Sequence, residues 1–243
     1  MEVAEYRNIY ENEDQHFFYR ANHDLFLSFV SPFRTKIKRR LKILDAGCGT
    51  GLLAKKLEKF GEVVGVDISP QALFYSKKRG IKVKRASVNK LPFQAKTFDI
   101  VLSMDVLYHR QVNDKKALIE FWRVLKPGGL LLIRVPAHPL LFSSHDRFVH
   151  ARQRYVKREL MIKLKEAGFI IQKITYVNSV LFAPALFKVG FEKIKYPNTS
   201  ASAVASIPNF VNQILTNLLK AENFFAKHFF LPFGIGLFAV AKK

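Results

Sequence analysis

The segment 41–51, LKILDAGCGTG, constrains the fold of this 243-residue chain more than any other stretch. Leu41, Ile43 and Leu44 indicate a short buried strand, the glycines indicate a turn, and residues 52–57 have the spacing of a helix. A strand that runs through glycines into a helix brings free backbone N–H groups, at the positive end of a helix dipole, to a ligand. Glycine has no Cβ to hold that ligand away. The segment therefore predicts an α/β fold with a ligand site at the end of this strand.

The same segment fits two kinds of ligand site. Residues 49–54 match the dinucleotide pattern G-x-G-x-x-G/A, and Asp67 follows at a distance suited to a ribose. Three further motifs occur in order: Val66-Asp67, Leu91-Pro92-Phe93 before the apolar run 98–102, and Lys126-Pro127-Gly128-Gly129 before a second apolar run. The ordered set resembles the class I S-adenosylmethionine-dependent methyltransferases, in their small-molecule branch, over residues 41–176 and 234–243. A nicotinamide-dependent oxidoreductase is the disfavoured alternative.

The resemblance implies a fold and an activity. The fold is a Rossmann-like α/β sheet of seven mostly parallel strands with helices on both faces and an inserted helical cap. We expect one methyltransferase domain over residues 1–243, divided into an N-terminal helical cover (1–40), a core (41–177), a helical insertion (178–233) and a final strand (234–243). The implied reaction is methyl transfer from S-adenosyl-L-methionine, which leaves S-adenosyl-L-homocysteine, to an oxygen or nitrogen of a small-molecule, lipid or lipid-linked, glycan-type acceptor.

The resemblance also implies which residues contact the cofactor. Asp67 would accept the ribose hydroxyls, and Ser87 stands where related enzymes often have an Asp that accepts from the adenine amino group. A serine hydroxyl is a weaker acceptor than a carboxylate. The cofactor-binding residues expected are Asp45, Gly47, Cys48, Gly49, Gly51, Asp67, Ile68, Ser87, Val88 and Ser103.

Histidines after two of the predicted strands are candidates for the acceptor side. Ligands of open α/β sheets bind outside the carboxyl ends of the strands, where His109 and the loop 136–155 lie. Imidazole titrates near neutral pH and suits a general base. The expected catalytic residues are His145, His109 and Asp146, and the expected substrate-binding residues are Tyr19, Arg20, His138, His150 and Arg154. His145, Asp146 and His150 lack a further carboxylate or cysteine to complete a metal site, so no metal is predicted.

The net charge of the chain indicates what kind of partner it binds. The chain has 40 Lys and Arg against 19 Asp and Glu, a net charge of +21, and six basic residues fall within 34–42. This balance favours an anionic lipid, a phosphorylated substrate or a polyanion. The Asn/Asp-Pro-Pro-aromatic motif of base-methylating enzymes does not follow strand 98–102. An RNA methyltransferase is therefore disfavoured, and a non-catalytic cofactor-binding protein is a further alternative.

The cysteine content, the N-terminus and the apolar segments indicate where the protein is located and how it assembles. A single cysteine allows no intrachain disulfide, and the acidic N-terminus does not resemble a signal peptide. The longest apolar runs fall short of the ~20 residues that span a bilayer, so we expect a cytoplasmic protein. The insertion 178–233 has two interpretations. As a cap or a dimer contact it would bury its phenylalanines, whereas as an interfacial helix it would touch a membrane peripherally.

Overall fold

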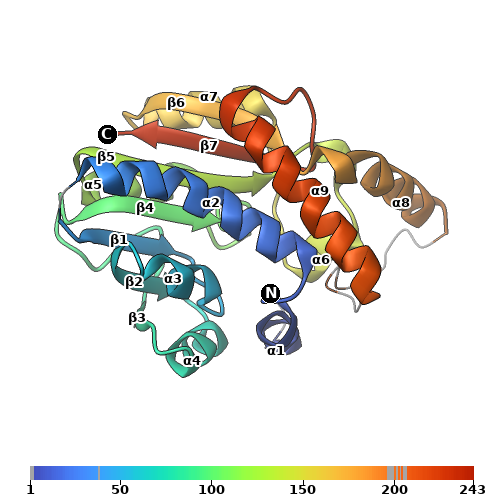
Figure 1. Ribbon diagram of the computed structural model, residues 1–243, viewed down its shortest axis with the longest axis horizontal. Helices are drawn as coiled ribbons and strands as arrows, with labels where there is room; N and C mark the ends of the chain where they lie inside the picture. The colour runs from blue at the N-terminus through green and yellow to red at the C-terminus, as the bar shows by residue number, and fades with distance from the viewer. Residues whose placement is uncertain (1–2, 38, 196–199, 201, 203, 205–206) are drawn as a thin grey trace.

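The computed structural model describes residues 3–37, 39–195, 200, 202, 204 and 207–243. A seven-stranded sheet lies at its centre, with strand order β3-β2-β1-β4-β5-β7-β6 (Figure 1). Strand β7 runs antiparallel to both of its neighbours, and the other neighbouring pairs are parallel. The strands are β1 (Leu41–Ala46), β2 (Gly61–Asp67), β3 (Lys82–Arg85), β4 (Phe98–Met104), β5 (Leu125–Pro136), β6 (Ile170–Val177) and β7 (Gly236–Lys242). The predicted fold class is confirmed.

Helices cover both faces of this sheet (Figure 1). They are α1 (Val3–Asn12), α2 (Phe17–Lys36), α3 (Leu52–Leu57), α4 (Pro70–Lys78), α5 (Asp114–Val124), α6 (Ser144–Phe148), α7 (Lys157–Glu166), α8 (Phe182–Lys195) and α9 (Asn209–His228). Alternate residues of β5 point to opposite faces. Leu132 packs with Phe26 of α2, and Leu131 packs in a second cluster with Phe121 of α5. The central strands are therefore apolar on both sides, as a parallel sheet between two helical layers requires.

Local signals explain several element boundaries. Ser69 begins α4 by accepting a hydrogen bond from the backbone N–H of Ala72 at 3.4 Å, with Pro70 in the first turn. Gly168, which follows α7, has φ +91°, a conformation that glycine adopts without strain.

Three boundaries differ from the sequence-based expectation. The N-terminal region forms two helices, because the chain turns between Asn12 and Phe17. Strand β5 begins at Leu125, before the two glycines, because its backbone already pairs with Phe98 of β4. The segment after β5 contains the short helix α6, which begins at a capping box made by Ser143 and Asp146.

Part of the basic run at 34–42 has a structural role. Arg39 and Lys126 both donate to Asp99, with nitrogen–oxygen distances of 2.8 and 2.9 Å, and the backbone N–H of Lys42 donates to the same carboxylate. These bonds hold the pKa of Asp99 at about 2, against the opposing effect of its burial. Lys38 lies outside the described residues. We conclude that Arg39 anchors the start of β1.

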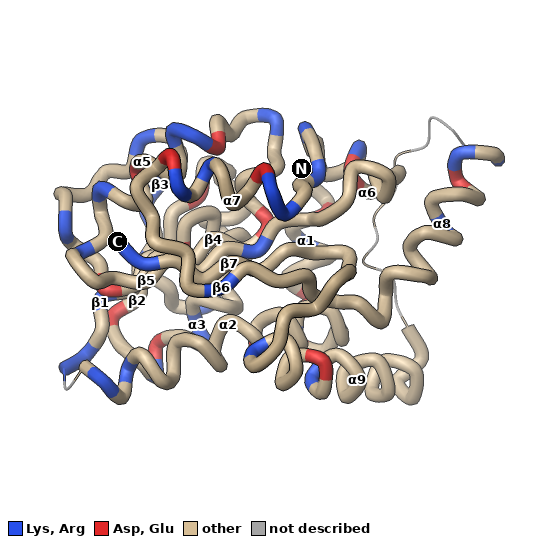
Figure 2. Tube along the Cα trace, turned by 90° about the horizontal axis from the view of Figure 1, so that it is seen from above, with Lys and Arg blue, Asp and Glu red and all other residues tan. Residues whose placement is uncertain are grey.

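The insertion is helical, as expected, and its described part contains α8 and α9. Helix α9 packs across α2, where Asn223 donates to the backbone carbonyl of Ala21 at 2.7 Å and Leu219 is buried. Helix α8 projects from the body of the molecule (Figures 1 and 2). Residues 196–199, 201, 203 and 205–206 of the insertion lie outside the description. Within the described part of the chain, no helix is both long and apolar enough to cross a bilayer.

The topology fixes where a ligand binds. Strand order reverses between β1 and β4, and the carboxyl ends of these strands open a crevice at one edge of the sheet. Open α/β sheets bind ligands at such a point. A six-stranded, all-parallel dinucleotide-binding sheet has the order 3-2-1-4-5-6. Here the antiparallel β7 lies between β5 and β6, and this difference argues against a nicotinamide-binding fold.

Candidate active site

The loop between β1 and α3 is shaped by three glycines with positive φ, Gly47, Gly49 and Gly51. A Cβ on Gly47 would lie 2.3 Å from Val106, so this glycine is required by packing. A Cβ on Gly49 would meet no atom within 4 Å, because Gly49 faces a cavity. The loop therefore brings its backbone to the cavity wall at Gly49, where a ligand can approach closely.

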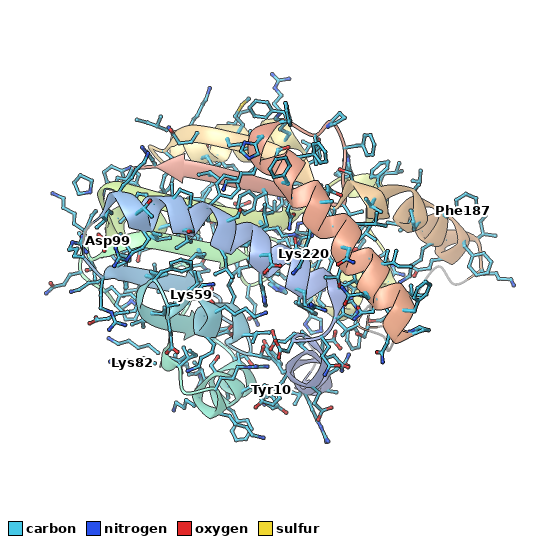
Figure 3. All side chains as sticks on the ribbon, in the orientation of Figure 1. Tyr10, Lys59, Lys82, Asp99, Phe187 and Lys220 are labelled. Atoms are coloured by element: carbon cyan, nitrogen blue, oxygen red, sulfur yellow. The ribbon has the colours of Figure 1, made fainter. Side chains whose placement is uncertain are left out.

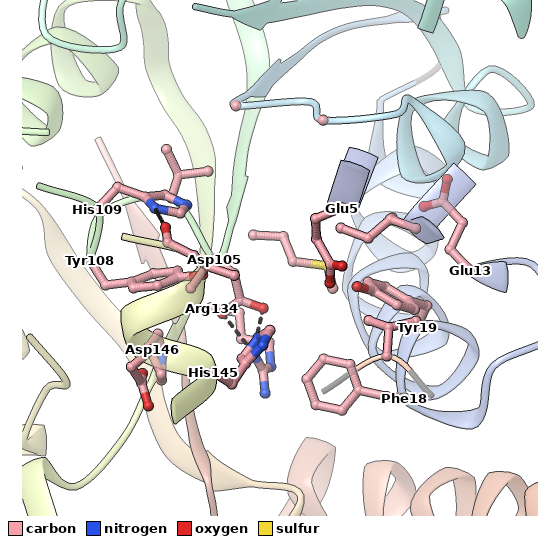
Figure 4. A pocket seen from close by; sticks show the side chains of 18 of the residues that line it. Glu5, Glu13, Phe18, Tyr19, Asp105, Tyr108, His109, Arg134, His145 and Asp146 are labelled. Atoms are coloured by element: carbon pink, nitrogen blue, oxygen red, sulfur yellow. Dashed lines mark hydrogen bonds and ion pairs between the residues drawn. The ribbon is translucent and has the colours of Figure 1, made fainter. Parts of the chain in front are cut away.

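The cavity has a volume of about 730 Å³. It lies between the carboxyl ends of the strands, the N-terminal helices, α6 and α8. Figure 4 shows Glu13, Phe18 and Tyr19 on one side of it and Asp105, His109 and His145 on the other. Its size falls in the range of ligand sites, ~300–1,000 Å³.

Asp45, at the end of β1, is the most unusual group in this cavity. It is buried, and within the described residues neither of its carboxylate oxygens has a hydrogen-bond partner. Burial raises the pKa of Asp45 to about 7, and the charges of Asp67 and Glu13 act in the same direction. A buried carboxylate without a partner is costly. Asp45 therefore suits a ligand that brings a donor or a positive charge.

Asp67, at the end of β2, is already oriented for a ligand. Its two oxygens accept the backbone N–H groups of Gly49 and Ser69 at 3.0 and 2.9 Å. Burial raises its pKa, and these two bonds act against that rise. Each carboxylate oxygen has two lone pairs, so Asp67 retains capacity to accept two hydroxyl groups. Asp67 can therefore accept donors from a ligand in the cavity.

An unexpected contact ties the N-terminal segment to the glycine loop. The hydroxyl of Thr50 donates to the carboxylate of Glu13, which also accepts from Arg79 at 2.8 Å. Glu13 is buried, and burial raises its pKa to about 7 despite these partners. Sequence reasoning placed a helical cover here but missed Glu13. We infer that this carboxylate holds the cover on the loop.

A second missed cluster lies at the far side of the cavity. Arg134, buried on β5, pairs with Asp105 at 2.5 and 2.6 Å and donates to Asn178 at 2.8 Å. The ring of Phe18 stacks on its guanidinium, 4.8 Å away. A signal was present in the sequence, because Arg134 is the one charged residue in the apolar run 130–135. Buried charges of this kind need partners, and here they fix the end of β4 relative to β5.

Two candidate bases line the cavity. The Nδ1 of His109 lies 2.9 Å from the carbonyl oxygen of Val149, and since a carbonyl only accepts, Nδ1 carries the proton. Burial lowers the pKa of His109 to about 4, so its ring is neutral at pH 7 with Nε2 as the acceptor. Burial also lowers the pKa of His145. Figure 4 shows His145 beside the Asp105–Arg134 pair, facing the side of the cavity that carries Phe18 and Tyr19.

Asp146 and Arg154 pair with each other at the cavity wall. Asp146 accepts from the backbone and hydroxyl of Ser143 at 2.8 and 2.9 Å, and from three guanidinium contacts of Arg154 at 2.8 to 3.0 Å. Both groups line the cavity but are engaged with each other. We assign them the role of holding α6, and with it His145, against the cavity.

Most expected site residues do meet at this cavity. They are Asp45, Gly47, Cys48, Gly49, Asp67, Ile68, Ser87, Val88, Tyr19, His109, His145, Asp146, His150 and Arg154.

Four expected residues do not line it. Gly51 faces Ser76, Ser103 is buried within β4, and His138 stacks on Tyr176 with ring centroids 4.8 Å apart. Arg20 follows Tyr19, and the helical rotation between neighbours turns it away. Within the described residues, no three His, Cys, Asp or Glu side chains gather to hold a metal.

Comparison with known proteins agrees with this geometry. Residues 44–133 match a family model described as a methyltransferase domain. An uncharacterised protein of Methanocaldococcus jannaschii is 36% identical over 153 residues, which cover 63% of this chain and 64% of that protein. The ubiquinone/menaquinone biosynthesis C-methyltransferase of Francisella philomiragia is 28% identical over 190 residues, which cover 71% of this chain and 75% of that enzyme.

A solved structure supports the fold. The S-adenosylmethionine-dependent methyltransferase of Mesorhizobium loti superimposes with a TM-score of 0.56 at 17% identity, covering 87% of this chain and 96% of that one. The chain spans less than two thirds of the length of the curated relatives that it matches at 35% identity or more. Residues 44–133 therefore contain a methyltransferase domain, and the ordered motifs and the position of β7 agree with those of the class I S-adenosylmethionine-dependent methyltransferases.

Proposed function

We propose that this protein transfers a methyl group from S-adenosylmethionine to an oxygen or nitrogen atom of a small-molecule acceptor that has an apolar part. The observation that carries the proposal is the unpartnered carboxylate of Asp45 beside the open face of Gly49. S-adenosylmethionine carries an α-ammonium group and a sulfonium centre, so it supplies the positive charge and the donors that Asp45 lacks.

The residues around this carboxylate fit the rest of the cofactor. Asp67 retains lone pairs for the ribose hydroxyls, and Ile68, Ser87 and Val88 line the cavity beyond it, where the adenine would lie. When bound, the cofactor supplies an electrophilic methyl group on sulfur. The role of the protein is then to align the acceptor atom with that methyl group, to exclude water and to take up a proton.

The proton acceptor that we propose is His145, with His109 as the second candidate. Both rings line the cavity, and burial lowers both pKa values, so each ring is neutral at pH 7. In the proposed methyl transfer the acceptor atom would form a bond to the methyl carbon as the carbon–sulfur bond breaks, and the acceptor's proton would pass to the imidazole. The Asp105–Arg134 pair lies beside His145 and would stabilise its orientation (Figure 4).

The acceptor side of the cavity supports an acceptor with an apolar part, such as a lipid or a lipid-linked sugar. Its wall includes Pro184, Ala185 and Val189 of α8, together with Leu141. The named relative from Francisella philomiragia acts in quinone biosynthesis, which is consistent with a small apolar acceptor for a related domain. Apolar lining with few polar groups is the usual composition of a small-molecule site.

A labelled-methyl assay tests the proposal. The protein and methyl-labelled S-adenosylmethionine are incubated in three separate reactions, with lipid extract, with water-soluble metabolites or with RNA from cells. We expect label in the organic extract of the reaction with lipid, and loss of that label with Asp67→Ala. Label confined to RNA would point to an RNA methyltransferase. Cofactor binding by calorimetry without label in any fraction would support a non-catalytic binding protein.

A further inference from the structure

The helical insertion exposes its aromatic residues instead of burying them. Phe187 and Phe191 of α8 are 85% and 54% exposed, and Phe187 lies at the outer side of this projecting helix (Figure 3). Phe225 of α9 is exposed, as are Phe229 and Phe230 in the turn that follows. A cap packed on the sheet or over the cavity would have buried these rings. Exposed aromatic residues in this number on one insertion favour an interaction surface.

The exposed residues of α9 form a regular stripe. Val211, Ile214, Leu218 and Phe225 are all exposed, and their spacing of three, four and seven residues places them on one side of the helix. The opposite side contains Leu219 and Asn223, which pack against α2. Helix α9 therefore uses one face to join the fold and leaves a second apolar face open.

The two acids of these helices face the protein, and two of their lysines lie at the exposed end of α8. Residues 182–195 and 209–228 contain five lysines and two glutamates. Glu192 accepts from the backbone and hydroxyl of Ser144, and Glu222 accepts from the backbone N–H of Val180, so both acids face the protein. Lys193 and Lys195 are exposed near the end of α8. Lys188 lines the cavity and pairs with Glu192 at 3.7 Å, and Lys220 pairs with Asp24 of α2 at 2.8 Å. The positive charge of the open apolar faces is therefore concentrated at the end of α8.

Lysine side chains from neighbouring elements add to this pattern. The Nζ atoms of Lys157 and Lys173 lie 5.3 and 4.5 Å from the ring centroid of Phe230, and Nζ of Lys195 lies 5.1 Å from that of Phe191. Figure 2 shows basic residues at the end of α8 as well. Aromatic rings next to lysines combine burial in acyl chains with attraction to lipid phosphates.

We propose that the outer faces of α8 and α9, with the turn that follows α9, dock on the surface of an anionic lipid bilayer. A second copy of the chain would fit this surface less well, because two molecules of net charge +21 would bring lysines against lysines. An anionic bilayer neutralises those charges as it covers the phenylalanines. The docking goes beyond methyl transfer and requires neither cofactor nor acceptor.

The inner side of α8 gives this docking a structural consequence. Val189 is buried and lines the cavity together with Pro184, whereas Phe187 and Phe191 of the same helix are exposed. One helix thus separates the cavity from the proposed lipid surface. If the proposed methyl transfer holds, an acceptor embedded in the bilayer would lie next to the cavity wall.

Vesicle co-sedimentation tests the docking. The full chain is mixed with phosphatidylcholine vesicles, with or without phosphatidylglycerol, at low and at high sodium chloride. We expect sedimentation with the anionic vesicles at low salt and weaker binding at high salt. The double variants F187S/F191S and F225S/F229S should each weaken binding at least about tenfold, since each removes two aromatic side chains from the lipid contact.

A matched control separates docking from general surface hydrophobicity. Phe74, on α4, is 62% exposed and lies away from the insertion, so F74S should bind vesicles like the wild type. Circular dichroism checks that each variant is folded.

Failure of the folded wild type to sediment with anionic vesicles would overturn the proposal. Salt-sensitive binding that both double variants retain would also overturn it, because docking would then be electrostatic alone. Sedimentation equilibrium that shows a dimer, lost in the double variants without any vesicle binding, would assign the surface to a second copy.

Discussion

The two ends of the cavity are built in different ways. The cofactor end uses residues 45–51 and 67–69, where Asp67 accepts hydrogen bonds from the backbone N–H groups of Gly49 and Ser69. The acceptor end combines Arg134 of β5, Asp105 after β4, His145 of α6 and the inner side of α8. One end is determined by local sequence, and the other depends on elements far apart in the chain. Local chemistry can therefore identify the cofactor, whereas the acceptor depends on tertiary packing.

The largest effect is expected at the cofactor end. Gly49→Val places a branched side chain in the space that faces the cavity. It also forces valine to adopt the φ of +54° that Gly49 has in this loop. We expect no detectable S-adenosylmethionine binding by calorimetry. Gly190→Val is the matched control, because a Cβ at Gly190 in α8 also meets no atom within 4 Å. Wild-type affinity in a folded Gly49→Val protein would contradict the placement of the cofactor.

At the acceptor end, replacement of the base should change the rate and leave cofactor affinity intact. His145→Gln is expected to lower turnover by ~10²–10⁴-fold, the range for a general base. His109→Gln is the parallel variant, and its ring is held by Val149. Turnover with the identified acceptor and cofactor affinity are measured for both. If both variants keep the wild-type rate, a group other than these histidines accepts the proton.

Asp67→Ala should produce a smaller loss at the cofactor end. The change removes the acceptor for ribose and also the bonds to Gly49 and Ser69. We expect S-adenosylmethionine binding to weaken by ~1.5–3 kcal/mol, as for hydrogen bonds to a charged group. Arg20→Ala is a suitable control, since Arg20 does not line the cavity. Equal affinity of Asp67→Ala and wild type would rule out the ribose contact.

The smallest effect is a pH dependence. The pKa of Asp45 is raised to about 7, and a positively charged ligand stabilises its ionised form. The free protein must therefore lose a proton to bind the cofactor, so affinity should rise with pH by up to ~tenfold per unit below that pKa and level off above it. Asp45→Asn should reduce this slope, and Glu13, with a pKa also near 7, would account for a residual slope. Affinity that falls as the pH rises would contradict this assignment.

Most residues that the sequence predicted for the cofactor end lie together at the cavity for a physical reason. A strand, a glycine turn and a helix are adjacent in the chain, so the positions of Asp45, Gly49 and Asp67 follow from the local backbone and the parallel pairing of β1 with β2. The resemblance to the class I methyltransferases implied the seven-stranded sheet and the helical insertion. Ser103 does not line the cavity, because it is buried within β4.

The acceptor end could not be predicted in the same way. Arg134 joins Asp105 to Asn178, and Arg154 folds back onto Asp146. Glu13 lies at the cofactor end but was missed for the same reason, because the turn between α1 and α2 lies on Thr50. Pairing of side chains from separate elements has no pattern in sequence spacing. Exposure of Phe187 and Phe225 was equally undetermined, because a buried cap and an interfacial helix share the same composition.

The central claim is that the cavity beside Gly49 binds S-adenosylmethionine through this chain's own carboxylates. The most direct measurement is a calorimetric titration of the wild type and of Asp67→Ala with S-adenosylmethionine and, in parallel, with NADH. We predict saturable binding of S-adenosylmethionine to the wild type, weaker binding to the variant and no heat of binding with NADH. Binding of NADH in place of S-adenosylmethionine, or affinity for S-adenosylmethionine that Asp67→Ala leaves unchanged, would contradict the account.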